Sequence, residues 1–311
     1  MVRRPERELG RPWSAAVVSA RPGEGATLVT AAAGALIDAE TGPKGQNVIL
    51  MDADVRTAGL TALLGAWHAV GTGDEYGMGT GAGDGGGLPG FALDRHVALR
   101  DRSVEQRLQE LRSPDGRSGD MSLLAMRAPG STALASLPDL SEITGRAVEL
   151  LADLAGCLLV DCGPGWGPLT RRICETVEYV FVVGRADARS HPDTVRLVER
   201  LDASGLLSKT IGYVANTPGQ SPQATRQSTQ LAGQCAEFTR HSPEFSVGGT
   251  HSEGTLALRS IMDLPYDPRA AQTLAHGKLS GPQSPFESAL CQGMEALEPD
   301  LFRTGFDFDI T

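Results

Sequence analysis

Three aspartates follow apolar segments of this chain, at positions where carboxylates could hold a metal ion and a water. Asp52 and Asp54 come directly after the apolar run 47–51, and Asp161 closes the run 157–161. Residues two apart on a strand point to the same side, so Asp52 and Asp54 could both face one Mg²⁺ ion and one attacking water. One of the two would position the water and the other would act as base. Asp161 is a candidate to support the metal through water.

A glycine-rich turn, residues 21–27, precedes the aspartates and reads Arg-Pro-Gly-Glu-Gly-Ala-Thr. Gly23 and Gly25 would let backbone N–H groups point into one concavity at the start of a helix, where the helix dipole favours an anion. Thr27 offers a hydroxyl ligand for Mg²⁺. Ala26 stands where a phosphate-binding loop carries the lysine that reaches the β- and γ-phosphates. The sequence therefore predicts the geometry of a nucleotide site without its main positive charge.

The elements that position these residues alternate along most of the chain. Apolar segments of strand length alternate with helical patterns, and two buried strands joined by a helix run in the same direction. This predicts an α/β fold, a doubly wound, mostly parallel sheet with helices on both faces and ligands at the carboxyl ends of the strands. The expected strands are 15–20, 47–51, 121–126, 157–161, 179–183, 211–216 and 258–264. The expected helices are one that ends at residue 39, and 101–111, 140–155, 169–176, 191–203 and 269–276.

Three stretches differ from this alternating pattern, and the remainder, residues 14–280, is expected to form one domain. Residues 1–13 are charged and contain prolines, which predicts a flexible arm. Residues 71–90 contain ten glycines and too few apolar groups to offset chain entropy, which predicts a disordered loop. Residues 281–311 form an acidic tail with one possible helix. The apolar face of that helix would consist of Phe286, Leu290, Met294 and Leu297.

The overall composition limits the classes of partner and compartment. With a net charge of −10 over 311 residues, the chain lacks the basic excess that supports non-specific nucleic-acid binding. Its five cysteines are scattered without Cys-x-x-Cys spacing, so neither a disulfide framework nor a zinc site is indicated. No apolar run approaches the ~20 residues of a membrane span, and the first residues lack a signal-peptide core. We therefore expect a cytoplasmic protein without an integral membrane segment.

The order and spacing of three motifs resemble the deviant Walker A superfamily, which comprises the MinD and ParA partition ATPases and the bacterial tyrosine kinases of polysaccharide export. The family's K-G-G-x-G-K-[ST] loop corresponds to residues 21–27, its strand ending Asp-x-Asp to 48–54, and its strand ending Asp-x-x-Pro to 158–164. The residues of the first two motifs are closer to those of the kinases, and later segments resemble the partition branch. The resemblance spans residues 14–277 and implies a P-loop NTPase-like fold.

The resemblance implies a nucleotide site that holds ATP or ADP with Mg²⁺. Thr27, Asp52 and Asp161 would bind the metal, the two carboxylates through water. Asp54 would orient the hydrolytic water. The loop residues assigned to the phosphates are Gly23, Glu24, Gly25, Ala26 and Thr27.

The resemblance also implies an adenine subsite and a homodimer. Asn216, with the loop from Pro265 to Asp267, would flank the adenine. Arg21 stands where the family's first loop lysine crosses the dimer interface to the partner's phosphates. It keeps the positive charge, and its planar fork suits a phosphate group.

Ala26 is the departure that counts most against catalysis. Loss of one donor that neutralises developing charge typically costs roughly 10²–10³ in rate. Arg56 or Arg185 could take over its place sterically. We therefore expect a degenerate MinD/ParA-like protein with weak nucleotide binding and weak or no ATP hydrolysis. It would act as a dimeric positioning or scaffold factor through contacts with a larger assembly.

Two alternatives are an active partition-type ATPase and a relative of the polysaccharide tyrosine kinases. The chain has only four tyrosines, and its last residues, 306–311, contain no tyrosine cluster, which argues against the kinase. Cys162 lies beside Asp161 but has no evident histidine partner, so a small buried residue is favoured over a nucleophile. Trp166 either contacts partners or packs within the domain.

Overall fold

The computed structural model of the chain describes residues 13–41, 46–69, 107–111, 121–126, 139–185, 189–216, 260–265, 267–275 and 284–297, with residues 88, 92, 104, 105 and 137. The expected arm up to residue 12 and residues 70–87 of the glycine-rich segment lie outside this set. Near the end of that segment, Leu88 is buried, and its N–H donates to the carbonyl of Ala125 at 2.9 Å. This end of the segment is therefore anchored on the domain.

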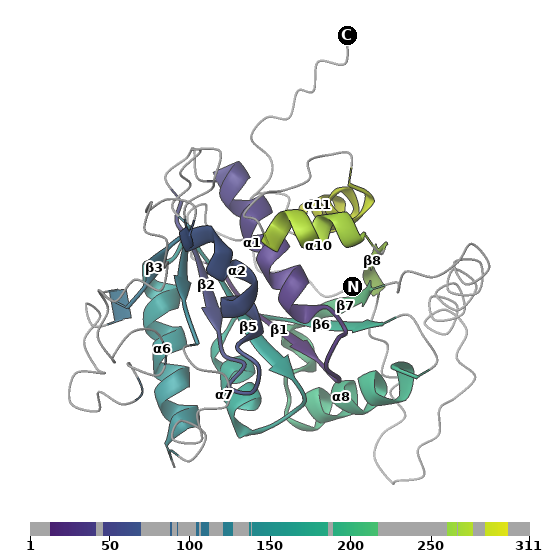
Figure 1. Cartoon of the computed structure of the whole chain (residues 1–311). Helices are drawn as coiled ribbons and strands as arrows, with labels where there is room; N and C mark the ends of the chain where they lie inside the picture. Colours follow the sequence, from purple (N-terminus) through teal and green to yellow (C-terminus); the bar gives the residue numbers. More distant parts are fainter. Residues whose placement is uncertain are drawn as a thin grey trace, which may run out of the picture.

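One sheet organises the molecule. Its strands are β1 (Trp13–Ser19), β2 (Val48–Asp52), β3 (Gln109–Glu110), β4 (Met121–Leu124), β5 (Cys157–Pro164), β6 (Tyr179–Arg185), β7 (Thr210–Asn216) and β8 (Ser260–Leu264). The spatial order is β3-β4-β2-β5-β1-β6-β7-β8 (Figure 1). Every neighbouring pair is parallel except β3 and β4. The predicted mostly parallel, doubly wound sheet is confirmed, and the carboxyl ends of its parallel strands share one edge.

Helices cover both faces of the sheet. They are α1 (Ala26–Thr41), α2 (Gly59–Ala69), α6 (Leu140–Leu154), α7 (Pro168–Thr176), α8 (His191–Ala203), α10 (Pro268–Ala275) and α11 (Pro285–Leu297), with a short 3-10 helix at Leu207–Lys209. Helices α1, α2, α10 and α11 lie on one face, and α6, α7 and α8 lie on the other (Figure 1). Side chains of the first group pack in one buried cluster, and those of the second group pack in another. No helix in the described part of the chain is both long enough and apolar enough to cross a membrane.

The central strand shows why the sequence forms a sheet buried on both sides. Along β1, Ala15 and Val17 belong to the cluster under α1, whereas Ala16 and Val18 belong to the cluster under α6 and α7. Successive side chains of a strand alternate between faces, so a strand covered on both faces reads as a continuous apolar run. The apolar run 15–20 is the sequence signature of this position.

The structure differs from the sequence predictions in two elements. Residues 109–110, inside the predicted helix 101–111, form β3 and pair antiparallel with β4. The backbone is extended there because it completes the edge of the sheet. Helix α2 was not predicted, because Gly59 and Gly65 lower its helix propensity. Its position depends on tertiary contacts with α1 and α10.

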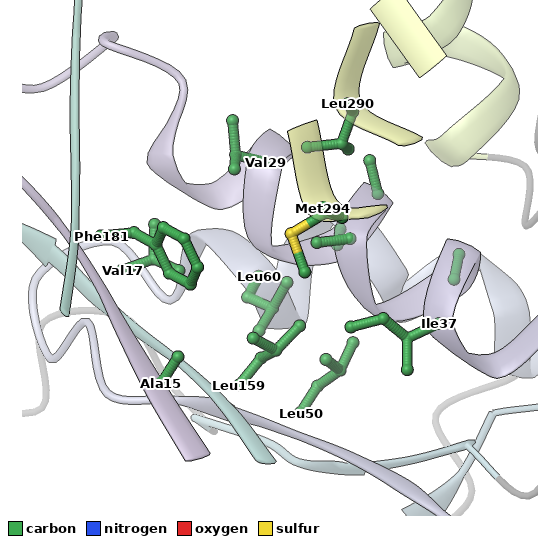
Figure 2. Packing of buried hydrophobic residues seen from close by; sticks show 14 of the residues in the cluster. Ala15, Val17, Val29, Ile37, Leu50, Leu60, Leu159, Phe181, Leu290 and Met294 are labelled. Atoms are coloured by element: carbon green, nitrogen blue, oxygen red, sulfur yellow. The ribbon is translucent and has the colours of Figure 1, made fainter. Parts of the chain in front are cut away.

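Two segments near the termini belong to the core. Trp13 begins β1 and is buried against Tyr179 and Phe181, with ring centroids 5.9 and 6.1 Å apart. It is therefore part of the sheet and lies outside any arm. Helix α11 forms within the expected acidic tail, and Leu290 and Met294 point toward α1 and the sheet (Figure 2). The expected apolar face of this helix is buried: Phe286, Leu290, Met294 and Leu297.

Candidate functional site

The three strand ends that carry the candidate residues are neighbours in the sheet. Strand β5 lies between β2 and β1, and Asp52 on β2 is paired in register with Asp161 on β5. Thr27 follows β1 in the first turn of α1, and its Oγ1 donates to Asp161 Oδ2 at 2.6 Å. The fold therefore brings Thr27, Asp52 and Asp161 together, as the sequence predicted.

The turn between β1 and α1 has the backbone shape of an anion-binding loop. Gly23 and Gly25 have φ of 81° and 96°, a left-handed conformation that glycine adopts without steric cost. Helix α1 begins at Ala26, and the helical hydrogen bonds start with Val29 N–H donating to Gly25 O at 2.9 Å. The amides of the first turn have no acceptor within the helix, and the helix dipole favours an anion in front of them.

The first residue of α2 closes the site beside Thr27. A side chain at Gly59 would place its Cβ 3.1 Å from Thr27 Oγ1 and 3.3 Å from Thr57 Oγ1. Glycine therefore lets α2 approach the hydroxyl that holds Asp161. This contact joins the loop after β1 to the segment after β2.

Asp52 is buried and connects three elements. Its Oδ2 accepts from the N–H of Thr61 at 2.8 Å and from Thr61 Oγ1 at 2.7 Å, and its Oδ1 accepts from the N–H of Asp54 at 3.0 Å. Thr61 Oγ1 in turn accepts from the N–H of Met126 at 2.7 Å, just beyond β4. Burial raises the pKa of Asp52 to about 7; the hydrogen bonds of Thr61 oppose this shift, and the charge of Asp161 adds to it.

Asp161 shares the same buried environment. Its Oδ2 accepts from Thr27, and its Oδ1 accepts from the N–H of Gly163 at 3.0 Å. Burial raises the pKa of Asp161 to about 6, although the hydrogen bond from Thr27 lowers it. Two buried carboxylates in register on adjacent strands disfavour a second negative charge, and a nearby cation would offset that cost.

Asp54 uses its carboxylate to hold its own turn. Oδ1 accepts from the N–H groups of Arg56 at 2.9 Å and Thr57 at 3.2 Å, and Oδ2 accepts from the hydroxyl of Thr57. Gly163, with φ of 65°, packs against this carboxylate, since an added Cβ would lie 2.5 Å from Asp54 Cγ. In this arrangement Asp54 orients a turn, and its proposed role toward water remains a prediction.

Glu24 and Arg21 both contact the start of α8. The Glu24 side chain is buried, and its Oε2 accepts from the N–H groups of Ala20 at 2.8 Å and Arg21 at 2.9 Å. Its Oε1 accepts from the hydroxyl of Ser190. The Arg21 guanidinium donates to the carbonyl of Arg189 at 3.0 Å and lies 3.5 Å from the carboxylate of Asp193. The two titratable side chains of the loop therefore both make contacts within the same chain.

The candidate adenine residues lie on the β7–β8 side of the sheet, away from the aspartates. Asn216 ends β7 and is in register with Arg185 on β6 and with Leu264 on β8. Pro265 follows Leu264 directly. Asp267 Oδ1 accepts from the N–H groups at the start of α10, at 2.9 and 3.2 Å, and its Oδ2 accepts from Ser284 Oγ at 2.8 Å. The Ser284 hydrogen bond lowers the pKa of Asp267. Asp267 thus caps α10 and ties it to the start of α11, whose Glu287 N–H donates to Ser284 Oγ.

The donor set suits a cation that takes part of its coordination from other groups. In the described residues, no three His, Cys, Asp or Glu side chains gather closely enough to hold a metal by themselves. Thr27, Asp52 and Asp161 supply one hydroxyl and two carboxylates. Asp52 Oδ1 and both oxygens of Asp161 accept one protein donor each, so each carboxylate keeps lone-pair capacity for a further partner. Mg²⁺ is commonly held by one or two carboxylates together with waters and substrate phosphates. The residues present therefore fit such an ion.

Ala26 and Cys162 contribute packing in this structure. Ala26 is buried, and its methyl group belongs to the cluster under α1. Cys162 follows Asp161 and is buried with Cys174, and the hydrogen bond to Cys174, followed by burial, raises the pKa of its thiol. A protonated buried thiol agrees with the interpretation of Cys162 as a small core residue. Trp166 is partly buried and packs against the cluster under α6 and α7, which also contains Cys162 and Cys174.

Sequence reasoning missed two side chains that organise the site. Thr61 links Asp52 to the end of β4, and Ser190 links Glu24 to α8. The only local signal was a hydroxyl residue near the start of each helix, which is typical of a helix cap. Their actual partners depend on the strand order.

Comparison with known proteins identifies the fold. No protein-family model and no curated protein matches this chain. Solved structures do: MinD with Mg-ADP from Pyrococcus horikoshii has a TM-score of 0.61 at 16% identity, over 92% of this chain and 96% of that chain. A ParA-family ATPase from Chlorobium tepidum has a TM-score of 0.61 at 13% identity, over 91% and 99% of the two chains. A McdA–ATP complex from Cyanothece has a TM-score of 0.62 at 16% identity, over 93% and 97%. This chain shares the fold of the MinD/ParA P-loop ATPases.

Proposed function

We propose that this chain is a degenerate nucleotide-binding protein of the MinD/ParA type, which binds ATP or ADP with Mg²⁺ and hydrolyses ATP weakly or not at all. The observation that carries the proposal is the hydrogen bond from Thr27 Oγ1 to Asp161 Oδ2 at 2.6 Å. It lies beside the glycine turn before α1, in which Gly23 and Gly25 have positive φ. Solved structures of the same fold hold Mg-ADP and ATP. Bound Mg²⁺ would neutralise charge on the phosphate oxygens.

The weak chemistry is argued from residue 26. The first-turn amides would hold the phosphates, and Thr27 with Asp52 and Asp161 would hold the metal. Ala26 supplies a buried methyl group in place of the ammonium that stabilises developing charge. We therefore assign the phosphate loop to the deviant Walker A class with its charge removed. The similarity of this loop and of residues 52–56 to the kinases is a similarity of two short segments.

We further propose that the protein acts in the cytoplasm as a homodimer that positions or scaffolds a larger assembly through protein contacts. Arg21 is the residue proposed to cross the interface. In the single chain it lies on Arg189 and Asp193, with about half of its side chain exposed. An exposed pair of this kind is weak enough to open on dimerisation.

Calorimetry with ATP and ADP in the presence and absence of Mg²⁺, paired with a phosphate-release assay, tests the proposal. We expect saturable, Mg²⁺-dependent binding with release close to background. Ala26→Lys is expected to tighten ATP binding and raise release by roughly 10²-fold, because it restores the missing ammonium. Ala26→Met has a similar length without charge and is the matched control.

Three outcomes would contradict the proposal. If wild-type protein binds neither ATP nor ADP, the proposed nucleotide site is wrong. If wild-type protein releases phosphate rapidly, the alternative of an active ATPase is supported instead. Equal effects of Ala26→Lys and Ala26→Met would show that charge at residue 26 is not what limits the site. Sedimentation of wild type and Arg21→Ala, with and without nucleotide, tests the dimer separately.

A further inference from the structure

Glu24 stands in the middle of the phosphate loop, yet its side chain faces inward. It is 1% exposed, so a nucleotide in front of the loop cannot reach its carboxylate without rearrangement. Two successive backbone N–H groups, those of Ala20 and Arg21, converge on one oxygen, Oε2, at 2.8 and 2.9 Å. Successive amides that converge in this way form an anion-binding nest. Here the anion is supplied by the chain itself.

The second carboxylate oxygen extends this contact to the next strand connection. Oε1 accepts from the hydroxyl of Ser190, the residue before α8, across a separation of 166 residues in sequence. Ser190 also provides the carbonyl that accepts from the N–H groups of Asp193 and Thr194, at 3.1 and 3.0 Å. The same side chain therefore fixes the amides that open the phosphate loop and the residue that starts α8.

We infer that the Glu24 side chain positions the loop and is not itself a ligand of the nucleotide. Its carboxylate holds the first half of the loop so that the amides after it, at Gly25, Ala26 and Thr27, face outward toward an anion. It also fastens the loop to α8 through Ser190. This inference rests on the proposed nucleotide site and gives the Glu24 carboxylate a role of its own, beside the backbone N–H contact to phosphate that the resemblance implies for the loop residues.

The physical reason lies in the missing lysine. A loop without an ammonium depends on backbone amides for its affinity, and their contribution is largest when their orientation is fixed before the ligand arrives. A buried carboxylate with three donors supplies that fixation, since charge-assisted hydrogen bonds are stronger than neutral ones. Its negative charge is already compensated by these donors.

The test compares Glu24→Ala, Glu24→Gln and Ser190→Ala in the full chain. Amide hydrogen exchange of the ligand-free protein reports the contact itself, and calorimetric titration with Mg-ADP reports its consequence. Glu24→Ala is expected to speed exchange at Ala20, Arg21 and the start of α8, and to weaken Mg-ADP binding about tenfold or more. Glu24→Gln keeps an oxygen that can accept from the two amides, so its amide exchange and its Mg-ADP affinity are both expected to be closer to wild type than those of Glu24→Ala. Ser190→Ala is expected to speed exchange mainly at α8.

The controls are Glu199→Gln and Ser208→Ala, which change exposed residues of α8 and the following turn. Unchanged exchange in Glu24→Ala would overturn the inference. So would a Glu24→Gln variant that loses affinity as severely as Glu24→Ala while its amide exchange stays at the wild-type rate, because that result would identify a role for the charge apart from positioning the loop. Should wild type bind no Mg-ADP, the proposed function fails by itself, and the exchange comparison still decides whether Glu24 holds the loop. If Glu24→Ala fails to fold, Ser190→Ala and Glu24→Gln decide by the same two measurements.

Discussion

At residue scale, this site is defined by buried carboxylates whose oxygens all have protein donors. Asp52 is held by Thr61 and Asp54, and Asp161 by Thr27 and Gly163. These bonds satisfy the acids in the absence of a ligand, which explains how the chain folds with acidic groups buried side by side. The bonds do not remove the desolvation cost of the charged forms, so both pKa values are raised.

The first prediction concerns the pH dependence of stability. The pKa of Asp52 is about 7 in the folded protein against an ordinary 3.8, so the folded chain keeps a proton that the unfolded chain has lost. The contribution of Asp52 to the free energy of unfolding is full below about pH 4 and falls by up to about 1.4 kcal/mol per pH unit toward pH 7. Urea unfolding at about pH 5 and about pH 8, in wild type and Asp52→Asn, measures the difference in slope.

Asp52→Asn is expected to lose this part of the pH dependence, because an amide does not titrate. Asp202→Asn, which changes an exposed residue of α8, is the control and should keep the wild-type slope. Identical slopes in wild type and Asp52→Asn would show that Asp52 is ionised throughout this range.

At the scale of elements, the site is assembled by the turns that follow β1, β2 and β5. Each of these connections depends on a glycine. Gly25 after β1 has a positive φ, whereas Gly59 at the start of α2 and Gly163 near the end of β5 lie where an added Cβ would meet neighbouring side chains. Gly163 is the most constrained of these, since it has a positive φ and packs directly on the Asp54 carboxylate. The turn after β2 is thereby held against β5.

The second prediction is that Gly163→Ala damages this junction. The new Cβ would meet Asp54 Cγ at 2.5 Å in a backbone conformation that disfavours a side chain. We expect the free energy of unfolding to fall by about 1–3 kcal/mol. Nucleotide binding should weaken as Asp54 and its turn are displaced. Urea unfolding and titration with Mg-ADP measure the two effects.

Gly167→Ala is the matched control in the same connection. Gly167 has φ of −138°, and nothing lies within 4 Å of a Cβ added there. A loss of stability as large as that of Gly163→Ala would place the cause in the connection as a whole and would contradict the contact with Asp54.

At the scale of the whole molecule, two buried clusters hold the sheet between its helical layers. The cluster under α1 includes α11 from near the end of the chain, and Leu290 and Met294 lie above Leu159 in Figure 2. These three residues line one small apolar void together with Val29 and Phe181. A close contact of Gly293 with Met262 brings α11 onto β8, since an added Cβ would lie 2.3 Å from Met262 Cγ. Helix α11 is therefore part of the layer that supports the site.

The third prediction tests this role of α11. Leu290→Ala removes a fully buried side chain beside a small apolar void, and we expect it to lower the free energy of unfolding by about 2–5 kcal/mol. Glu295→Ala, at an exposed position of the same helix, should change it by less than about 0.5 kcal/mol. Similar small effects of both variants would show that α11 does not stabilise the domain.

The sequence by itself determined the parallel strands, the glycine turn and the three aspartates at one edge, but not the short antiparallel strand β3. These follow from local patterns: apolar runs fix buried strands, glycines permit left-handed turns, and parallel strands bring their carboxyl ends together. The register of Asp52 with Asp161 then follows from the strand order that the sheet adopts. Local sequence was sufficient because each feature is encoded within a few neighbouring residues.

Only the tertiary structure decided what several of these side chains contact. Glu24 and Asp267 accept hydrogen bonds from Ser190 and Ser284, and Arg21 forms an ion pair with Asp193. Each pair is separated in sequence by more residues than a local pattern covers. An acid in a loop looks the same in sequence whether it faces a ligand or a distant helix. The choice depends on which element packs opposite, and that is set by the burial of both faces of the sheet.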